Sequence, residues 1–409
     1  MKMEIMAPAG TYESLMAAIK AGADSVYFGV EQLNMRSRSA NFKLGDLKKI
    51  AAICHKNNVK SYLTVNTIIY DHDTILMKKI CQAAKESGVD AIIAFDMAVL
   101  EYVRSIGLNV HCSTQLNISN IEAVRFFSRY SNVIVLAREL TLKQIKEICE
   151  QIRKQEIRGP NGELVKIEVF CHGALCVAIS GKCYMSLATD NASANRGACL
   201  QNCRRAYKVI DEETGDELVI DNKYVMSPKD LCTIGMLDRL QDAGVCILKI
   251  EGRGRPPEYV YTVTCTYKEA VNSLSEGKYT EKNIKAWTKR LESVYNRGFW
   301  QNGYYMGKKL GEWSGVYGSK ATKEKHLIGS VRHYYGKPQV AEILLEAGNL
   351  SKSEQVLIIG PTTGIVDLNA EEIFLDDKET TEVKKGNVIT IKVPNKVREK
   401  DKVYVMRKR

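Results

Sequence analysis

Residues 3–30 read MEIMAPAGTYESLMAAIKAGADSVYFGV and contain the repeating unit of the fold. A short apolar run at 3–9 precedes an amphipathic segment at 11–23, where apolar residues recur every three or four positions, as on one face of a helix. A second apolar run follows at 24–30. Gly22 stands just before it, where a helix-to-strand loop commonly requires a left-handed residue. The stretch therefore predicts a strand, a helix and a second strand.

The same alternation continues to about residue 255. The eight apolar runs are, in order, MEIMAPA, DSVYFGV, VKSYLTVN, AIIAFD, NVHCSTQ, NVIVLARE, IEVFCHG and CILKIEGR. Helical patterns separate most of these runs. Eight strands that alternate with helices predict an α/β protein with a TIM-like (β/α)8 barrel. A doubly wound sheet is the alternative, because a strand count from one sequence can be wrong by one.

The composition is that of a globular protein with a large core, since 45% of the 409 residues are hydrophobic. The first residues do not resemble a secretory signal, and no stretch approaches the roughly 18 apolar residues of a membrane span. We therefore expect a cytoplasmic protein without a membrane partner. The formal net charge of +11 favours contact with a polyanion, although a solvated basic surface would explain it equally well.

The pattern changes twice beyond the barrel. Residues 259–325 contain helical segments and then an aromatic, basic loop, FWQNGYYMGKKLGEW, which could stack nucleic-acid bases or pack against the barrel. Residues 326–409 contain six short apolar runs, which predict a small β-barrel domain that could dock RNA. The catalytic barrel is then expected at 1–258, with an insertion at about 173–224.

Polar side chains follow the predicted strands, at the end where (β/α)8 proteins place their active sites. They are Asn66, Asp96, His111, Ser113, Thr114, Gln115, Arg138, Glu139, His172, Lys249, Glu251 and Arg253. Each one alone could cap a loop or form an ion pair. His111 could equally be a satisfied core histidine.

Cysteines are concentrated around the insertion, in the run CHGALCVAISGKCYMSLATDNASANRGACLQNCR, which begins at Cys171 and has its last cysteine at Cys203. The other cysteines are scattered along the chain. In a reducing compartment such a group indicates metal binding or redox chemistry, because disulfides are rare there. Thiolates suit a structural zinc or an iron–sulfur cluster equally, and the spacing does not decide between them. A set of buried free thiols is the simpler alternative.

Several blocks of the chain resemble a known family. The run EVFCHGALCVAISGKCYMS closely resembles the signature of the peptidase U32 family, and further blocks resemble others of that family: MAPAG, ADSVYFG, HCSTQLN, LAREL, RGAC with the CR that follows it at Cys203 and Arg204, SPKDLC, KIEGR and NRGF. The family name implies a collagenase-like endopeptidase, but the sequence contains no Gly-x-Ser-x-Gly elbow and no His-Glu-x-x-His helix. Better-understood members resemble oxygen-independent hydroxylases that carry a [4Fe-4S] cluster and act on tRNA, ribosomal RNA or a ubiquinone precursor.

The length and the tail are most similar to the tRNA hydroxylation protein P group. This resemblance implies an RNA-modifying hydroxylase that forms 5-hydroxyuridine at the wobble position of tRNA, with prephenate as the oxygen donor; hydroxylation of ribosomal RNA is the alternative. It also implies four cluster ligands, Cys176, Cys183, Cys199 and Cys203. Cys232 is the alternative to Cys203, and zinc is the alternative metal.

A small dicarboxylate such as prephenate requires cationic or bidentate partners. The expected substrate-binding residues are Arg36, Asn66, Gln115, Lys249 and Arg253. The expected catalytic residues are His172, Glu251 and Arg138, of which the first two could move protons. The sequence indicates no oligomeric state.

Overall fold

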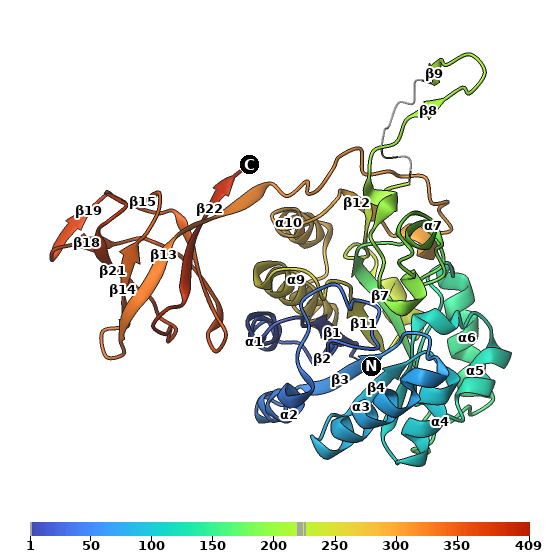
Figure 1. The fold of residues 1–409 in the computed structure, drawn as a ribbon. Coiled ribbons are helices and arrows are strands. Elements are labelled where there is room, and N and C mark those ends of the chain that lie inside the picture. The colour runs from blue at the N-terminus through green and yellow to red at the C-terminus, as the bar shows by residue number, and fades with distance from the viewer. Residues whose placement is uncertain (1, 219–223, 225) are drawn as a thin grey trace.

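A computed structural model describes residues 2–218, 224 and 226–409 (Figure 1). Its central feature is a closed ring of parallel strands in the order β11-β1-β2-β3-β4-β5-β6-β7, with β11 also paired to β7. The strands are β1 Glu4–Pro8, β2 Ser25–Phe28, β3 Lys60–Val65, β4 Ala91–Ala94, β5 Asn109–Cys112, β6 Val133–Val135, β7 Lys166–Gly173 and β11 Ile247–Ile250. The predicted (β/α)8 barrel is confirmed, because a doubly wound sheet would leave two open edges.

Helices cover the outside of this ring. They are α1 Tyr12–Lys20, α2 Leu47–Lys56, α3 Thr74–Glu86, α4 Met97–Ser105, α5 Ile121–Phe127, α6 Leu142–Lys154, α8 Leu237–Asp242 and α9 Pro257–Ser275. Polar caps start several of them; the Thr141 hydroxyl, for example, accepts a hydrogen bond from the Gln144 amide. Gly22 ends the first unit with φ +83°, as the sequence predicted. No helix among the described residues is long and apolar enough to cross a membrane.

The segment after β7 leaves the barrel and returns to it. It contains α7 Met185–Asp190 and a hairpin of β8 Val209–Ile210 and β9 Glu217–Leu218, which projects away from the barrel in Figure 1. The chain then forms β10 Asp230–Cys232, antiparallel to the end of β7, and later β12 Phe299–Gln301 joins β10. The sequence did not predict these two strands, because three residues are too few for a periodic pattern. Residues 219–223 of the predicted insertion lie outside the described residues.

The helices that follow the barrel strands are part of the same core. Helix α9 packs against α1 and β1, so the boundary predicted at residue 258 falls inside its first turn. Helix α10, Glu281–Glu292, packs against α9. In the aromatic loop beyond it, Trp300 and Tyr305 are buried, and the Tyr305 hydroxyl donates a hydrogen bond to the Phe170 carbonyl at 2.6 Å. These aromatic rings therefore pack against the barrel.

The sequence predicted a small β-barrel domain for the remaining residues, and they form an antiparallel sheet with its own core. Its strands are β13 Lys323–Tyr335, β14 Val340–Leu345, β16 Gln355–Gly360, β17 Gly364–Asn369, β18 Ile373–Leu375, β19 Lys378–Thr380, β21 Val388–Lys392 and β22 Lys402–Lys408, with β15 Asn349–Ser351 and β20 Glu382–Lys384 paired separately. The run at 366–375 was expected to be one strand. It is two, because β17 pairs with β16 whereas β18 pairs with β21.

The sheet docks on the barrel through α1 and α9, beside which it lies in Figure 1. Gly364 makes the closest approach: a Cβ atom there would lie 2.8 Å from the backbone carbon of Met16 in α1. Ile365 and Leu357 of the sheet and Ala17 of α1 form a small apolar cluster around this point. The docking therefore depends on the absence of a side chain at Gly364.

Gly364→Ala should lower the free energy of unfolding by about 1–3 kcal/mol, because the added methyl group meets helix backbone that cannot move aside. The midpoint of thermal unfolding should fall by several degrees as a result. The positive φ of +66° at Gly364 adds strain to any L-residue there. Differential scanning calorimetry measures the effect. Gly336→Ala is the matched control, because a Cβ at Gly336 meets nothing within 4 Å. Equal midpoints for the two variants would show that the contact with α1 is not rigid.

Candidate functional site: a cationic cavity lined by cysteines

A cavity of about 240 Å³ opens at the carboxyl ends of the barrel strands. Side chains from several strand ends line it, as expected for a (β/α)8 barrel. Those predicted from the sequence are Arg36, Asn66, Ser113, Thr114, Gln115, Arg138, Lys249, Glu251 and Arg253. The inserted segment after β7 forms the other wall, because Ala174, Leu175 and Gly181 also line the cavity.

Four cysteines of the insertion reach this cavity: Cys176, Cys183, Cys199 and Cys203. The segment is fastened to the barrel by Arg196, which forms an ion pair with Asp73 and donates a hydrogen bond to the Ile68 carbonyl at 2.8 Å. Next to it, Gly197 lies so close to the Asn34 carbonyl that a Cβ atom could not be accommodated. These contacts hold the RGAC block, and therefore Cys199, against the loop after β2.

The four thiols influence one another electrostatically. Burial raises the pKa of the Cys203 thiol, the positive charge of Arg204 opposes this rise, and negative charge on Cys176, Cys199 and Cys183 adds to it. The sulfur atoms therefore share one environment. Among the described residues, however, no group of three or more His, Cys, Asp or Glu side chains is arranged to hold a metal ion as it stands. The thiols line a common cavity without meeting at one point.

The other two cysteines of interest lie outside the cavity. Cys171 and Cys232 are fully buried between the sheet and α9, where the Tyr267 hydroxyl lies 3.9 Å from the sulfur of Cys232. Burial raises the pKa of the Cys232 thiol to about 11. Cys232, the alternative fourth ligand, is therefore separated from Cys176, Cys183 and Cys199, whereas Cys203 lies with them.

The cavity is strongly cationic. Six arginines and one lysine line it: Arg36, Arg138, Arg204, Arg253, Arg255, Arg297 and Lys249. Among the described residues, Glu251 is the one carboxylate on the lining. Three of these arginines, Arg204, Arg255 and Arg297, were not predicted as site residues. Arg204 and Arg297 stand in blocks that carry the family resemblance, CR and NRGF, and that position in the sequence was the available signal.

Glu251 is the counter-ion of this cavity. Its Oε1 atom lies 2.6 Å from Nη2 of Arg36. Burial opposes ionisation of the Glu251 carboxyl, but the charges of Arg36, Arg138 and Arg253 outweigh it and lower its pKa to about 2. Glu251 is therefore a carboxylate at neutral pH and a weak base. The predicted role in moving protons does not fit this environment.

His172 does not reach the cavity, which corrects the expectation that it could be catalytic. Its ring packs among Tyr259, Tyr267 and Phe299, with centroid distances of 6.1, 5.5 and 5.4 Å. Burial lowers the pKa of His172 to about 3, so the ring is neutral at physiological pH. The register of β7 against β11 shifts beside His172. A strand pattern in the sequence cannot reveal such a shift, and this explains the error.

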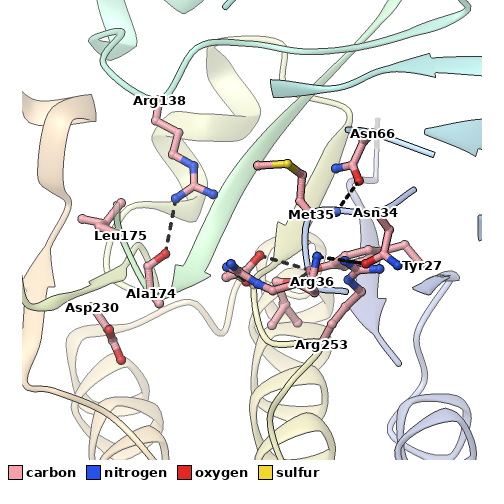
Figure 2. A network of polar contacts seen from close by, with 12 residues as sticks. Tyr27, Asn34, Met35, Arg36, Asn66, Arg138, Ala174, Leu175, Asp230 and Arg253 are labelled. Atoms are coloured by element: carbon pink, nitrogen blue, oxygen red, sulfur yellow. Dashed lines mark hydrogen bonds and ion pairs between the residues drawn. The ribbon is translucent and has the colours of Figure 1, made fainter. Parts of the chain in front are cut away.

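Two of the expected substrate-binding cations are held by the protein itself. Nη1 of Arg253 donates to the Thr64 hydroxyl and Nη2 to Oδ1 of Asn34, both at 2.7 Å, as Figure 2 shows for Asn34. Nζ of Lys249 lies 2.7 Å from Oε1 of Glu168. Burial lowers the pKa of Arg253 to about 10, but the group stays charged at neutral pH. Both side chains position neighbouring groups and have few free donors.

The two uncharged residues that were predicted to bind substrate are Asn66 and Gln115. Oδ1 of Asn66 accepts a hydrogen bond from the Met35 amide at 3.1 Å (Figure 2), and its amide nitrogen lies 3.5 Å from Oε1 of Gln115. Both side chains line the cavity, and Asn66 braces the loop that carries Arg36. Asp96 caps α4 instead.

His111 is a core histidine. It lies inside the barrel beneath the cavity, with Nδ1 3.9 Å from Oε2 of Glu168. Burial lowers the pKa of His111 to about 3. The ring does not line the cavity. Glu139 is exposed to solvent and does not line the cavity either.

The fold and the site define a class of (β/α)8 barrel proteins in which a cysteine-bearing insertion lies over a cationic cavity. Residues 10–315 match the sequence profile of peptidase family U32, and the chain belongs to this family. A protein named collagenase from Porphyromonas gingivalis is 54% identical over 407 residues, which cover 99% of this chain and 98% of that protein.

Other relatives have names of a different kind. A tRNA hydroxylation protein P1 from Bacillus subtilis is 29% identical over 384 residues, covering 92% of this chain and 88% of that protein. A 23S rRNA 5-hydroxycytidine synthase from Escherichia coli is 36% identical over 276 residues, covering 67% of this chain and 40% of that protein. Family membership is therefore shown, while the names of the relatives divide between proteolysis and RNA hydroxylation.

Glu251→Gln tests the electrostatics of the cavity. The low pKa of Glu251 in the folded protein contributes stability that is complete above the ordinary value of 4.5 and is lost as the pH falls toward 2. We expect the wild type to exceed the variant in free energy of unfolding by a few kcal/mol at pH 6. The difference should shrink below pH 4.5. Urea titrations from pH 6 to pH 3 measure it, and a difference that stays constant over this range would contradict the assignment.

Proposed function

We propose that this protein is an RNA-modifying hydroxylase that carries an iron–sulfur cluster and forms 5-hydroxyuridine at the wobble position of tRNA. The observation that carries the proposal is the position of Cys176, Cys183, Cys199 and Cys203 on the lining of one cationic cavity at the barrel mouth. The names of the relatives from Bacillus subtilis and Escherichia coli support an RNA substrate. A tRNA substrate would place the protein in the cytoplasm.

The donor set fits a cluster cofactor. Four thiols from one segment are soft ligands of the kind that hold a [4Fe-4S] cluster, and zinc is the alternative that the same thiols would bind. The cluster would supply electron transfer or an iron site for the oxygen donor. Arg204 lies near Cys203, where its positive charge opposes the rise that burial causes in the pKa of that thiol, and Arg36 lies near Cys199. Positive charge close to a cluster also makes its reduction easier.

The second substrate is proposed to be a small dicarboxylate, with prephenate as the oxygen donor. Guanidinium groups bind carboxylates through paired hydrogen bonds, and six arginines line the cavity. Phe170, Ile93 and Val135 add apolar surface that could contact a carbon ring. The chain's residues would thus bind and orient the acid next to the cysteines.

An endopeptidase is the competing function, and the name of the Porphyromonas gingivalis relative favours it. The cavity offers little for peptide hydrolysis. No histidine is found among the described residues that line it, and its carboxylate, Glu251, is ionised and paired with Arg36. A serine or threonine on the lining would therefore lack a general base.

Nucleoside analysis tests the proposed reaction. Total tRNA from a strain without this gene should lose 5-hydroxyuridine and the wobble modifications made from it, as measured by mass spectrometry. A plasmid copy of the wild type should restore them. If tRNA is unchanged and ribosomal RNA loses a hydroxylated pyrimidine, the substrate is ribosomal RNA. If neither RNA changes, the hydroxylase proposal is wrong.

Cysteine variants test the cofactor. Anaerobically purified wild type should be brown and contain iron and sulfide. Cys203→Ser should lose most of the iron and the visible absorption, whereas Cys232→Ser should keep them, because Cys232 is buried away from the cavity. The two substitutions are matched in chemistry. Loss of iron from Cys232→Ser with retention in Cys203→Ser would identify the other ligand set, and a colourless, zinc-loaded wild type would exclude the cluster.

A further inference from the structure

Arg297 is brought to the cavity from a distant part of the chain. It stands in the NRGF block between α10 and β12, and Asn296 fixes the turn: its side-chain amide donates to the Val294 carbonyl at 2.9 Å and its Oδ1 accepts from the Gly298 amide at 2.9 Å. Because β12 pairs with β10, and β10 with the end of β7, the turn lies over the barrel mouth. Arg297 is only 6% exposed and lines the cavity.

The guanidinium of Arg297 is incompletely bonded. Its Nη1 atom lies 3.5 Å from Oδ1 of Asp230, at an ion-pair distance without a hydrogen bond. Both of these atoms are buried, and neither has a hydrogen-bond partner in the structure. A buried charged donor without an acceptor is unfavourable, so an anion in the cavity would satisfy Arg297 better than Asp230 does.

Arg138 is a second incompletely bonded cation. It follows β6, donates from Nη1 to the Ala174 carbonyl at 3.3 Å, and packs its guanidinium 4.0 Å from the centroid of the Phe170 ring. Its Nε atom is buried and has no hydrogen-bond partner. In Figure 2, Arg138 and Asp230 lie on the Ala174 side of the site, while Arg36 and Arg253 lie on the opposite side.

We propose that Arg138 and Arg297 bind a carboxylate of a small organic acid, and that Asp230 is an internal anion that competes with this ligand for Arg297. The other cations predicted for this task are engaged, Arg36 by Glu251 and Lys249 by Glu168. Planar guanidinium groups match the two oxygens of a carboxylate. Apolar lining at Phe170 suits an organic body, which inorganic phosphate lacks. The identity of the acid rests on the proposed function, for which prephenate is the probe.

The competition predicts opposite effects for two neighbouring substitutions. Isothermal titration calorimetry with prephenate and the anaerobically purified full-length protein should give a Kd about tenfold weaker or more for Arg297→Gln, because a charge-assisted hydrogen bond is lost. Asp230→Asn should bind several-fold more tightly than wild type, because the internal competitor is neutralised. Arg290→Gln is the control with an unchanged Kd, since Arg290 pairs with Glu269 and does not line the cavity.

A purely structural ion pair gives a different result. In that case both substitutions lower thermal stability and neither tightens prephenate binding, which would overturn the proposal. If Arg297→Gln does not fold, Arg138→Gln and Arg297→Lys are measured with Asp230→Asn, and unchanged binding in both arginine variants overturns it equally. Inorganic phosphate that binds the wild type as tightly as prephenate would assign the site to a phosphate and overturn the carboxylate assignment.

The test of the carboxylate site and the test of the proposed function can fail independently of each other. Binding that follows the predicted order, in a protein whose deletion leaves 5-hydroxyuridine intact, supports the carboxylate site and contradicts the hydroxylase. Loss of 5-hydroxyuridine on deletion, with prephenate binding unaffected by Arg297→Gln, supports the hydroxylase and contradicts the site. A wild type that binds neither prephenate nor phenylpyruvate contradicts the carboxylate site outright.

Discussion

The pairing of β11 with both β1 and β7 is the constraint on which the site depends. It closes the barrel, and it places Lys249, Glu251 and Arg253 at the mouth beside Phe170 of β7. Gly173, the last residue of β7, lies directly against the chain that follows β11: a Cβ atom there would lie 2.6 Å from the Glu251 carbonyl, and its φ is +109°. The cysteine segment therefore begins in contact with the closing strand, and this contact brings the thiols to the barrel mouth.

The charge balance of the cavity follows from the same geometry. Burying several cations together costs free energy unless anions or dipoles compensate them. The protein compensates some of them with Glu251, Glu168 and Asp230, and it places backbone carbonyls against others, such as those of Leu175 and Pro228 against Arg204. Arg138 and Arg297 keep unsatisfied donors. Cysteine thiolates and an anionic ligand would supply the negative charge that these cations lack. The proposed cluster site and the proposed carboxylate site would therefore both compensate the buried positive charge of the cavity.

Much of this arrangement could be predicted from the sequence, because strand and helix periods are local. The barrel strands and the position of the cysteine insertion are examples. The errors arise where tertiary contacts decide. His172 was assigned to the active face, but its side chain packs against Tyr267 of α9. Arg297 was not assigned to the site, because only the pairing of β12 with β10 brings it there. Neither of these tertiary contacts produces a periodic pattern in the sequence.

The names of the relatives refer to two different reactions, proteolysis and RNA hydroxylation. Because one fold supports many chemistries, the residues of the site are better evidence for the reaction than the names are. The 54% identity to a protein named collagenase measures how much sequence the two proteins share, and it does not say which reaction the cavity supports. A peptide is a neutral backbone in need of a nucleophile, a base and an oxyanion site. This cavity instead presents guanidinium groups, thiols and one carboxylate, Glu251, which is paired with Arg36. Such groups recognise anions and bind soft metals, so the chemistry of the lining fits a hydroxylase with an acidic co-substrate better than it fits peptide hydrolysis.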